Sequence, residues 1–445
     1  VTGISPLTTL VSGGIAQGWN TGTKIQASSP QAWSYFGSDV AMNSDGTMII
    51  VGMYGDNTGA SDAGSAYIYT YSGGSWGSEV RITSSDTLSS NDYFGRSVSM
   101  SSDGTKVIVG ANGKGGNNTG AVYIFTYSGS SWDAGTKIQA ASPSAADNFG
   151  FKVSMSSDGT KVAVAAHYQD SGGNGAGAVY IYTYSGGSWG SEVRLLAPDA
   201  EAGDQFGHGL AISGDGTKVI VGAHAETTGG SWSGSAYIFT YSGSSWDAGT
   251  KIVAPDAQVE DNFGYDVSMN SDGTKVIVGA YTEDAGGSNA GAAYIFVYNG
   301  SSWDTGTKIM APDPEVDDTF GNGVYMSSDG TKVIVGADLE DGGTGSPLNM
   351  AGTAYIFTYS GSSWDTGTKI MAPDAEAGDR FGGFVAMSSD GTKVIVGAKE
   401  EGTGGSSAGA VYVFDYQATA VFDASTQVFT ATGTGIVSGS TVQLE

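Results

Sequence analysis

Hydrophobic residues recur along this chain in short alternating runs of strand length, separated by turns rich in Gly, Ser, Asp and Asn. The pattern repeats seven times, and each repeat opens with a Phe-Gly pair that an Asp-Gly pair follows nine residues later. The phenylalanines are Phe36, Phe94, Phe149, Phe206, Phe263, Phe320 and Phe381, and the matching aspartates are Asp45, Asp103, Asp158, Asp215, Asp272, Asp329 and Asp390. Successive pairs are 55 to 61 residues apart. A period of this size indicates a solenoid, a propeller or an array of small domains.

One repeat contains four predicted strands. Residues 263–269 (FGYDVSM) and 274–280 (TKVIVGA) flank an Asp-Gly pair, which is typical of a two-residue hairpin turn in which both residues have positive φ. Residues 292–298 (AAYIFVY) alternate aromatic and aliphatic side chains, which predicts a strand covered on both faces. Residues 303–310 (WDTGTKIM) are the predicted fourth strand. Four antiparallel strands per repeat fit one blade of a propeller.

The two ends of the chain share one repeat. The seventh repeat stops after residues 410–416 and lacks its fourth strand, whereas the matching segment, residues 19–25 (WNTGTKI), precedes the first Phe-Gly pair. A ring can be closed by an N-terminal strand that completes the last blade, and closure removes exposed strand edges. We therefore predict an all-β fold, a seven-bladed β-propeller of four-stranded antiparallel blades over residues 19–416. Residues 1–18 are then a lead segment, and residues 417–445 are a β-rich tail or the start of a further domain.

Composition narrows the chemistry that the chain can perform. It contains 73 glycines and no cysteine, so a disulfide, a thiolate metal site and a thiol nucleophile are excluded. A net charge of -27 argues against nucleic acid or an anionic membrane as a partner, because both require clustered Lys and Arg. No apolar run approaches the roughly 18 residues that direct membrane insertion needs. The seven repeat tryptophans are expected in the core between blades, and the turn aspartates are expected to be structural.

Acidic residues gather in two sets of loops. The loops that enter each first strand and the loops between second and third strands lie at the same end of the ring, because strand direction alternates. They are most acidic in the fourth to seventh repeats. A solubilising surface is one interpretation of this anionic crescent. The other is a set of calcium sites, since Ca²⁺ prefers oxygen ligands. The predicted metal ligands are Asp204 with Glu226, Asp261 with Glu283 and Asp284, Asp318 with Glu340 and Asp341, and Asp379 with Glu400 and Glu401.

Residues that occur in one repeat only are not needed to make a blade. The three histidines are of this kind, and imidazoles on adjacent blades could also hold zinc. Tryptophans and tyrosines in comparable loops could stack on sugar rings, or pack on their own blades. The predicted ligand-binding residues are Trp33, Tyr54, His167, Tyr168, His208, His224, Trp232 and Tyr281.

The repeats, of the form FGxxVxMSSDGTKVIVGA followed by GAVYIFTY, resemble the FG-GAP repeats of integrin α-chain heads and of many microbial surface proteins. The resemblance implies a seven-bladed propeller that serves ligand binding or adhesion outside the cell or at its surface. It also implies calcium, held by a loop of alternating aspartates between the first and second strands. Here that loop is only SDGT, with one carboxylate, so the family's calcium site is not carried over to Asp45, Asp103 or their equivalents.

No catalytic motif accompanies the repeats. The chain has no phosphate loop, zinc-protease motif or nucleophile elbow. We predict a non-catalytic extracellular binding module, part of a larger multidomain protein, that uses its acidic face and calcium to bind a glycan or a surface protein. The alternative is a polysaccharide-active enzyme, a glycoside hydrolase or a lyase, that uses carboxylates of the same face.

Overall fold

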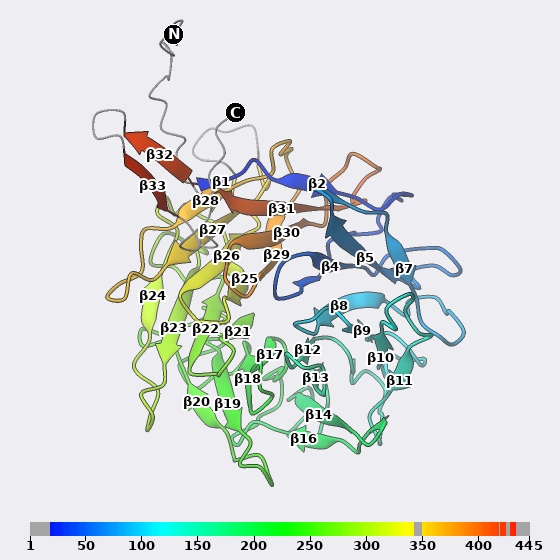
Figure 1. Cartoon of the computed structure of the whole chain (residues 1–445). Coiled ribbons are helices and arrows are strands. Elements are labelled where there is room, and N and C mark those ends of the chain that lie inside the picture. The colour runs from blue at the N-terminus through cyan, green and yellow to red at the C-terminus, as the bar shows by residue number, and fades with distance from the viewer. Residues whose placement is uncertain (1–17, 342–348, 418, 424–427, 433–445) are drawn as a thin grey trace, which may run out of the picture.

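The computed structural model describes residues 18–341, 349–417, 419–423 and 428–432. Within these residues, seven antiparallel sheets are arranged in a ring (Figure 1). We number the blades by their Phe-Gly pairs. Blade 1 contains β3 (Val40–Met42), β4 (Met48–Met53), β5 (Ser65–Ser72), β6 (Ser75–Trp76) and β7 (Val80–Ile82), from the axis outward. The predicted all-β, seven-bladed propeller is confirmed.

The other blades repeat this order. Blade 2 contains β8 (Phe94–Met100), β9 (Lys106–Ala111), β10 (Ala121–Thr126) and β11 (Thr136–Ile138), and blade 3 contains β12 (Val153–Met155), β13 (Lys161–Ala166), β14 (Ala178–Ser185), β15 (Ser188–Trp189) and β16 (Val193–Leu195). Blade 4 contains β17 (Leu210–Ile212), β18 (Lys218–Ala223), β19 (Ser235–Thr240) and β20 (Thr250–Ile252), and blade 5 contains β21 (Val267–Met269), β22 (Lys275–Ala280), β23 (Ala292–Val297) and β24 (Thr307–Ile309). Blade 6 contains β25 (Phe320–Met326), β26 (Lys332–Ala337), β27 (Thr353–Thr358) and β28 (Thr368–Ile370), and blade 7 contains β29 (Phe381–Met387), β30 (Lys393–Ala398) and β31 (Ala410–Gln417).

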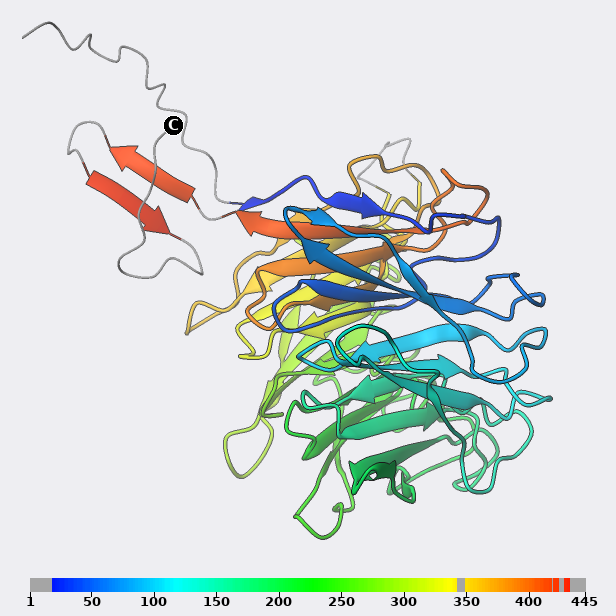
Figure 2. The same ribbon diagram turned by 45° about the vertical axis from the view of Figure 1, so that its right-hand side comes forward.

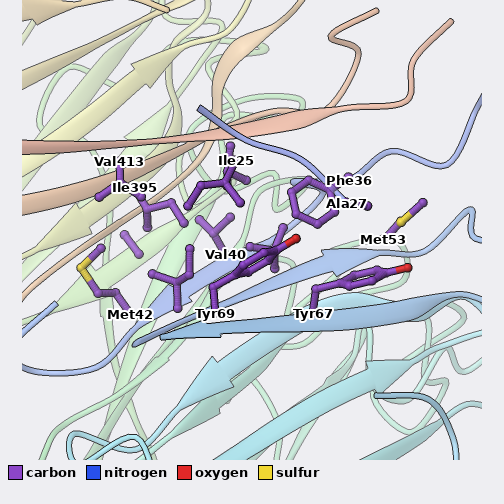
Figure 3. Packing of buried hydrophobic residues seen from close by; sticks show 14 residues of the cluster. Ile25, Ala27, Phe36, Val40, Met42, Met53, Tyr67, Tyr69, Ile395 and Val413 are labelled. Atoms are coloured by element: carbon purple, nitrogen blue, oxygen red, sulfur yellow. The ribbon is translucent and has the colours of Figure 1, made fainter. Parts of the chain in front are cut away.

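The N-terminal segment completes blade 7. Strands β1 (Gly18–Trp19) and β2 (Thr23–Ile25) pair antiparallel with β31, with Trp19 opposite Tyr416 and Lys24 opposite Tyr412. Behind this pairing, a buried cluster joins residues of blade 7 to residues of blade 1: Ile25, Ala27, Ile395 and Val413 pack with Phe36, Val40, Met42, Met53, Tyr67 and Tyr69 (Figure 3). The predicted closure of the ring by the N-terminal strand is therefore confirmed.

A second closure lies around the axis at the Asp-Gly turns. One residue of each turn donates its backbone N–H to the carbonyl oxygen of its counterpart in the next blade. The donors and acceptors form a cycle: Ser44 to Ser102, Ser102 to Ser157, Ser157 to Gly214, Gly214 to Ser271, Ser271 to Ser328, Ser328 to Ser389, and Ser389 back to Ser44, all at 2.8 to 3.1 Å. Each blade is thus both donor and acceptor, and we call this set the turn cycle.

The Phe-Gly pair joins adjacent blades. The ring of Phe320 is fully buried in a cluster that joins Ile277 and Ile295 of blade 5 to Tyr355 and Phe357 of blade 6. The backbone of each pair passes close to the second strand of the preceding blade. A Cβ added to Gly336 would lie 1.7 Å from the carbonyl oxygen of Gly382, so this contact requires glycine.

One local expectation was wrong, and another is refined. In the turn of blade 5 only Gly273 has positive φ, at 62°, because the loop is longer than predicted and Asn270 donates its N–H to the oxygen of Lys275. The carboxylate of Asp272 accepts the Thr274 N–H at 2.9 Å, which supports its structural role. The repeat tryptophans are half-buried and pack against the edges of the core clusters between blades, in line with the expectation. They line grooves between the outer strands of neighbouring blades, such as one of about 630 Å³ beside Trp303.

Beyond the ring, β32 (Thr419–Asp423) and β33 (Val428–Thr432) pair antiparallel. This hairpin projects away from the propeller (Figure 2). Across the described residues, no helix is long and apolar enough to cross a membrane.

Candidate functional site

One pocket on the ring axis collects residues from all seven blades. Its volume is about 370 Å³, and it lies at the end where each first strand begins and each second strand ends. We call it the central pocket. Its lining residues are Tyr54, Tyr93, Arg96, Asn112, Phe151, Lys152, His208, Tyr265, Asp266, Asn322, Asp338, Arg380, Gly383, Phe384 and Lys399. The acidic loops of the sequence prediction surround the same end.

The pocket is lined mainly from positions at which the repeats differ. Five of the seven second strands have the sequence KVIVGA, and the residue that follows them varies, from Asn112 in blade 2 to Asp338 in blade 6 and Lys399 in blade 7. The residue after each Phe-Gly pair varies in the same way, as Arg96 and Asn322 illustrate. A repeated frame thus presents non-repeated side chains to one cavity.

Aromatic rings form a continuous arc along one side of the central pocket. The distances between ring centroids along the arc are 6.5 Å for Trp33 and Tyr35, 5.1 Å for Tyr35 and Tyr54, 3.8 Å for Phe151 and His167, 5.2 Å for Phe151 and His208, 4.4 Å for His208 and Tyr265, and 4.3 Å for Tyr265 and Tyr281. Arg96 bridges the interval between blades 1 and 3, because its guanidinium carbon lies 5.7 Å from the ring centre of Tyr54 and 4.8 Å from that of Phe151. We call this set the aromatic arc.

The structure brings all eight predicted ligand-binding residues to this arc. Tyr54 and His208 line the pocket, and the rings of His167, His224 and Tyr281 contact lining residues. The remaining three lie outside the lining and are linked to it by ring contacts, Trp33 through Tyr35, Tyr168 through His167 and Trp232 through His224. We call them the rim, where Trp33 is 57% exposed, Tyr168 44% and Trp232 49%. Their role in binding stays a prediction.

Sequence reasoning missed Arg96, Phe151 and Tyr265. Each directly follows a Phe-Gly pair, inside a run that the period-2 pattern assigned to the first strand. In blades 3 and 5 that strand begins only at Val153 and Val267, so the residue after Phe-Gly lies at the mouth of the pocket. Variation among the repeats at this one position was the signal that could have found them.

Trp33 and Trp232 share a left-handed backbone conformation with their counterparts in the other blades. Trp33 has φ 63°, and the matching positions hold Gly203 and Gly378 but also Ala146 and Glu260, all with positive φ. Trp232 has φ 58°, and its counterparts include Gly175, Asn289 and Met350, again with positive φ. The conformation is therefore a property of the repeated loop and not of the two tryptophans.

The predicted metal ligands are paired with lysines that extend from the fourth strands. Lys308 Nζ lies 2.7 Å from Glu283 Oε1 and 2.9 Å from Asp256 Oδ2. Lys251, Lys369 and Lys24 bridge the corresponding pairs, which are Glu226 with Asp199, Glu340 with Asp313, and Glu401 with Asp374. These lysines reach the acidic loops because each side chain passes over a third-strand tyrosine, 5.6 Å from the ring centre of Tyr294 for Lys308.

The other predicted ligands have different partners. Four of them accept a backbone N–H within their own loop: Asp204 from Glu201 at 2.7 Å, Asp261 from Gln258 at 2.6 Å, Asp318 from Glu315 at 2.6 Å, and Asp379 from Glu376 at 2.8 Å. Asp284 accepts the Asn289 N–H at 2.8 Å, Glu400 lies 3.6 Å from Arg380 Nε, and the charge of Asp341 acts on Asp318. Among the described residues, no group of three or more His, Asp or Glu is arranged to hold a metal ion.

Comparison with known families gives seven matches to the FG-GAP repeat, at residues 19–69, 76–125, 132–182, 189–239, 246–296, 303–357 and 364–414. The chain belongs to the FG-GAP repeat family. The matches cover every blade, and the FG-GAP propeller suggests a binding or adhesion-type module. FG-GAP repeats are typical of extracellular or surface proteins. No curated protein matches this chain.

The histidines of this FG-GAP propeller are neutral in the physiological range. Burial lowers the pKa of His167 to about 3 and of His224 to about 4, and it holds the pKa of His208 well below the ordinary value. His208 Nδ1 lies 2.8 Å from the Tyr265 carbonyl oxygen, so it carries the proton and donates. The Nδ1 atoms of His167 and His224 have no hydrogen-bond partner within the described structure. The imidazoles therefore act as aromatic and polar groups and add no charge.

Three loop aspartates of the FG-GAP propeller resist ionisation. The pKa is raised to about 6 for Asp261, to about 7 for Asp318 and to about 6 for Asp379. Burial is the largest cause. The charge of a neighbouring glutamate adds to it, as Glu340 does for Asp318, although the backbone N–H bond acts in the opposite direction. These carboxyl groups change charge within the range in which the protein would work.

The Asp318→Asn variant is expected to melt a few °C higher than the parent at pH 8 and by a clearly smaller margin at pH 5. The folded-state pKa of about 7 exceeds the ordinary value of 3.8, so the folded protein holds this proton more tightly than the unfolded chain. The stability that the proton supplies is full below about pH 4 and is lost as pH rises through 7. Asparagine removes the charge and can still accept the Glu315 N–H. Thermal melts at both pH values measure the effect.

The matched control is Asp329→Asn, in a turn at the other end of the ring. Burial opposes ionisation of Asp329 as well, but hydrogen bonds from Ser327 and Thr331 lower its pKa below the ordinary value. It is charged at pH 5 and at pH 8, so its replacement should lower the melting temperature at both. An Asp318→Asn variant that behaves like this control would contradict the prediction.

Proposed function

We propose that this FG-GAP propeller is a non-catalytic binding module, outside the cell or at its surface, that holds a glycan over the central pocket. One observation carries the proposal. Seven closely similar repeats differ where their residues converge, and the convergent side chains form an aromatic arc beside hydrogen-bonding groups. A frame that is repeated seven times needs no such variety to fold.

The shape and chemistry of the central pocket favour a glycan over a surface protein as the partner. Its volume of about 370 Å³ is within the range of small-ligand sites and holds one or two rings rather than a protein surface. Aromatic faces such as those of Tyr265 and Trp232 can stack on the C–H faces of a sugar. Asn112 Oδ1 is buried without a hydrogen-bond partner among the described residues, and a sugar hydroxyl could donate to it.

The carboxylates of the central pocket support binding rather than catalysis. Only Asp266 and Asp338 contribute carboxylates to the lining. Asp266 accepts the Val324 N–H and lies 3.5 Å from Lys152 Nζ, while Asp338 accepts hydrogen bonds from Thr319 and Asn322. Both groups therefore have structural partners already. No observation favours the alternative, a glycoside hydrolase or lyase.

Calcium assistance is the second part of the proposal. Its support is that Glu283 Oε2 and Glu340 Oε2 are buried without a hydrogen-bond partner in the described structure, and both glutamates act on an aspartate of raised pKa. A cation beside such oxygens would compensate the cost of burying them. A lysine already contacts the other oxygen of each glutamate. Calcium would therefore have a supporting role, in which it orders the loops around the pocket.

Trp33→Ala and Trp232→Ala are each expected to weaken glycan binding about 10-fold while leaving the melting temperature unchanged, because both rings are exposed on the rim and each supplies a stacking face. Binding is measured by calorimetry with the strongest ligands from an array of neutral and acidic oligosaccharides. The same titrations and melts in millimolar calcium and in EDTA test the calcium part. Equal values in the two buffers would remove calcium from the proposal.

Tyr184→Ala is the matched control, because Tyr184 is 37% exposed but lies on the outer part of blade 3, remote from the axis. It should bind as the parent does. Three results would contradict the proposal: no glycan on the array binds, the rim variants bind as tightly as the control, or a bound oligosaccharide is cleaved on incubation.

A further inference from the structure

Most basic residues of this acidic protein occupy repeat positions, and nearly all of the others line the central pocket. The chain has 18 Lys and Arg. Six are lysines that begin a second strand, and seven are Lys or Arg of a fourth strand, so 13 of the 18 occupy repeat positions. Of the five that remain, Lys114 is buried in an ion pair with Asp92 at 2.8 Å. The other four line the central pocket, and they are Arg96, Lys152, Arg380 and Lys399.

Two of these four cations have no counter-ion. Within the described residues, the Arg96 guanidinium makes no hydrogen bond or ion pair, and it is held only by the faces of Tyr54 and Phe151. Lys399 Nζ likewise contacts only a ring, 5.5 Å from the centre of Phe384. A guanidinium has five N–H donors and an ammonium has three, and both are costly to leave unused in a half-buried site.

The acidic groups near the pocket are engaged by the other two cations. Lys152 Nζ lies 3.5 Å from Asp266 Oδ1, and the charge of Asp39 also acts to raise the pKa of Lys152. Arg380 faces Asp338 at 3.9 Å and Glu400 at 3.6 Å. The lining itself therefore holds four cations and two carboxylates, in a chain whose net charge is -27.

The charges around Lys399 act on its ionisation from several blades. Burial is the main cause that lowers its pKa, and the charges of Arg380 and Arg96 add to this, while Asp338 and Glu400 oppose it. The three cations are thus close enough to act on one another. An anion placed among them would relieve both the repulsion and the unused donors.

We propose that the central pocket binds one anionic group, a carboxylate or a sulfate, on the terminal ring of an acidic sugar, with Arg96 and Lys399 as its partners. The inference deepens the proposed function and rests on it. The planar guanidinium can donate two parallel hydrogen bonds to a carboxylate or sulfate, and the aromatic arc receives the ring that carries it. A single terminal charge fits better than a polyanion, because the surrounding acidic loops repel a run of charges.

The test compares matched oligosaccharides. The acidic probes are short oligosaccharides that are neutral except for a terminal hexuronic acid, sialic acid or sulfated hexose. Their neutral counterparts are the same molecules with the carboxylate reduced or the sulfate removed. Each is titrated into the protein. Parent protein, Arg96→Gln and Lys399→Gln are measured by calorimetry, with melting temperature as the check of folding. Lys106→Gln is the matched control, since Lys106 is a surface lysine that donates to the Asp158 carbonyl at the opposite end. An acidic peptide of equal charge is included to represent a protein partner.

At least one acidic probe is expected to bind the parent about 10-fold or more tightly than its neutral counterpart. That preference should fall to within about 2-fold in Arg96→Gln and in Lys399→Gln, and it should persist in Lys106→Gln. Equal binding of acidic and neutral forms, or a preference that survives both pocket variants, overturns the inference and leaves the proposed function standing. Binding of the peptide alone, or of no probe at all, overturns both.

Discussion

A chain shortened to begin at Ser28 is expected to melt at least about 10 °C below a chain that begins at Gly18, and to associate or aggregate. The shorter chain lacks β1 and β2, so the edge of β31 is left open. It also loses the buried side chain of Ile25 and the lysine that neutralises Glu401, which then remains as a buried and unpaired charge. Thermal melts and light scattering measure both effects.

Transfer of the missing segment to the other end should restore the fold. In blade 6 the residues Ser-Gly-Ser-Ser connect Tyr359 to Trp364, so residues 19–27 can be attached after Tyr416 through the same four residues. This rearranged chain keeps every strand pair of blade 7 and is expected to melt close to the parent. If the chain that begins at Ser28 were as stable as the parent, closure by the N-terminal strand would contribute nothing, and our account of the ring would be wrong.

Gly336→Val is expected to destabilise the propeller by about 3 kcal/mol or to prevent folding. A side chain at this position would meet the backbone of the next blade, since even a Cβ would lie 1.7 Å from Gly382 O. Backbone cannot move aside as the end of a flexible side chain can, so blades 6 and 7 would have to separate. Chemical denaturation followed by the fluorescence of the half-buried repeat tryptophans gives the free energy of unfolding.

Blade 3 provides the natural control for this substitution. Its second strand has Ala165 where its neighbours have glycine, and the facing Gly207 leaves room for that methyl group. Ala165→Gly should therefore change stability by less than about 1 kcal/mol. Gly336→Ala should fall between the two. Equal stability of Gly336→Val and the parent would contradict the inferred packing of the Phe-Gly pair.

The fold was open to prediction because its signals are local and repeated. The strand patterns, the turns and the repeat split between the two ends all concern neighbouring residues, and they led directly to the ring and to the pairing of Lys24 with Tyr412. The candidate site was only partly open to prediction. Residues in obvious loops, such as Trp33 and Trp232, were identified. Phe151 was missed because an inner strand that begins late looks, in sequence, like one that begins at Phe-Gly, and Arg96 was missed because it lies inside β8, where the pairing register shifts between Phe94 and Val98.

The acidic crescent shows a second limit of sequence patterns. The acidic loops do not show their counter-ions in sequence, because Lys251 and Lys308 belong to strands that are distant in sequence from the glutamates that they contact in space. Their side chains span the blade edge across a tyrosine ring, a path that depends on the relative position of three strands. Such contacts follow from register and twist, which no single repeat displays in its sequence.

The turn cycle fixes the number of blades in the ring. Each of its seven hydrogen bonds sets the angle between two blades, so one blade more or fewer would force every other pair to reorient. The repeats can vary in length, from 55 to 61 residues, because the additional residues enter loops at the opposite end. Insertion and substitution at the mouth therefore leave the turn cycle intact, whereas an added blade would break it. The side chains that select a ligand can therefore change while the seven-bladed ring stays the same size.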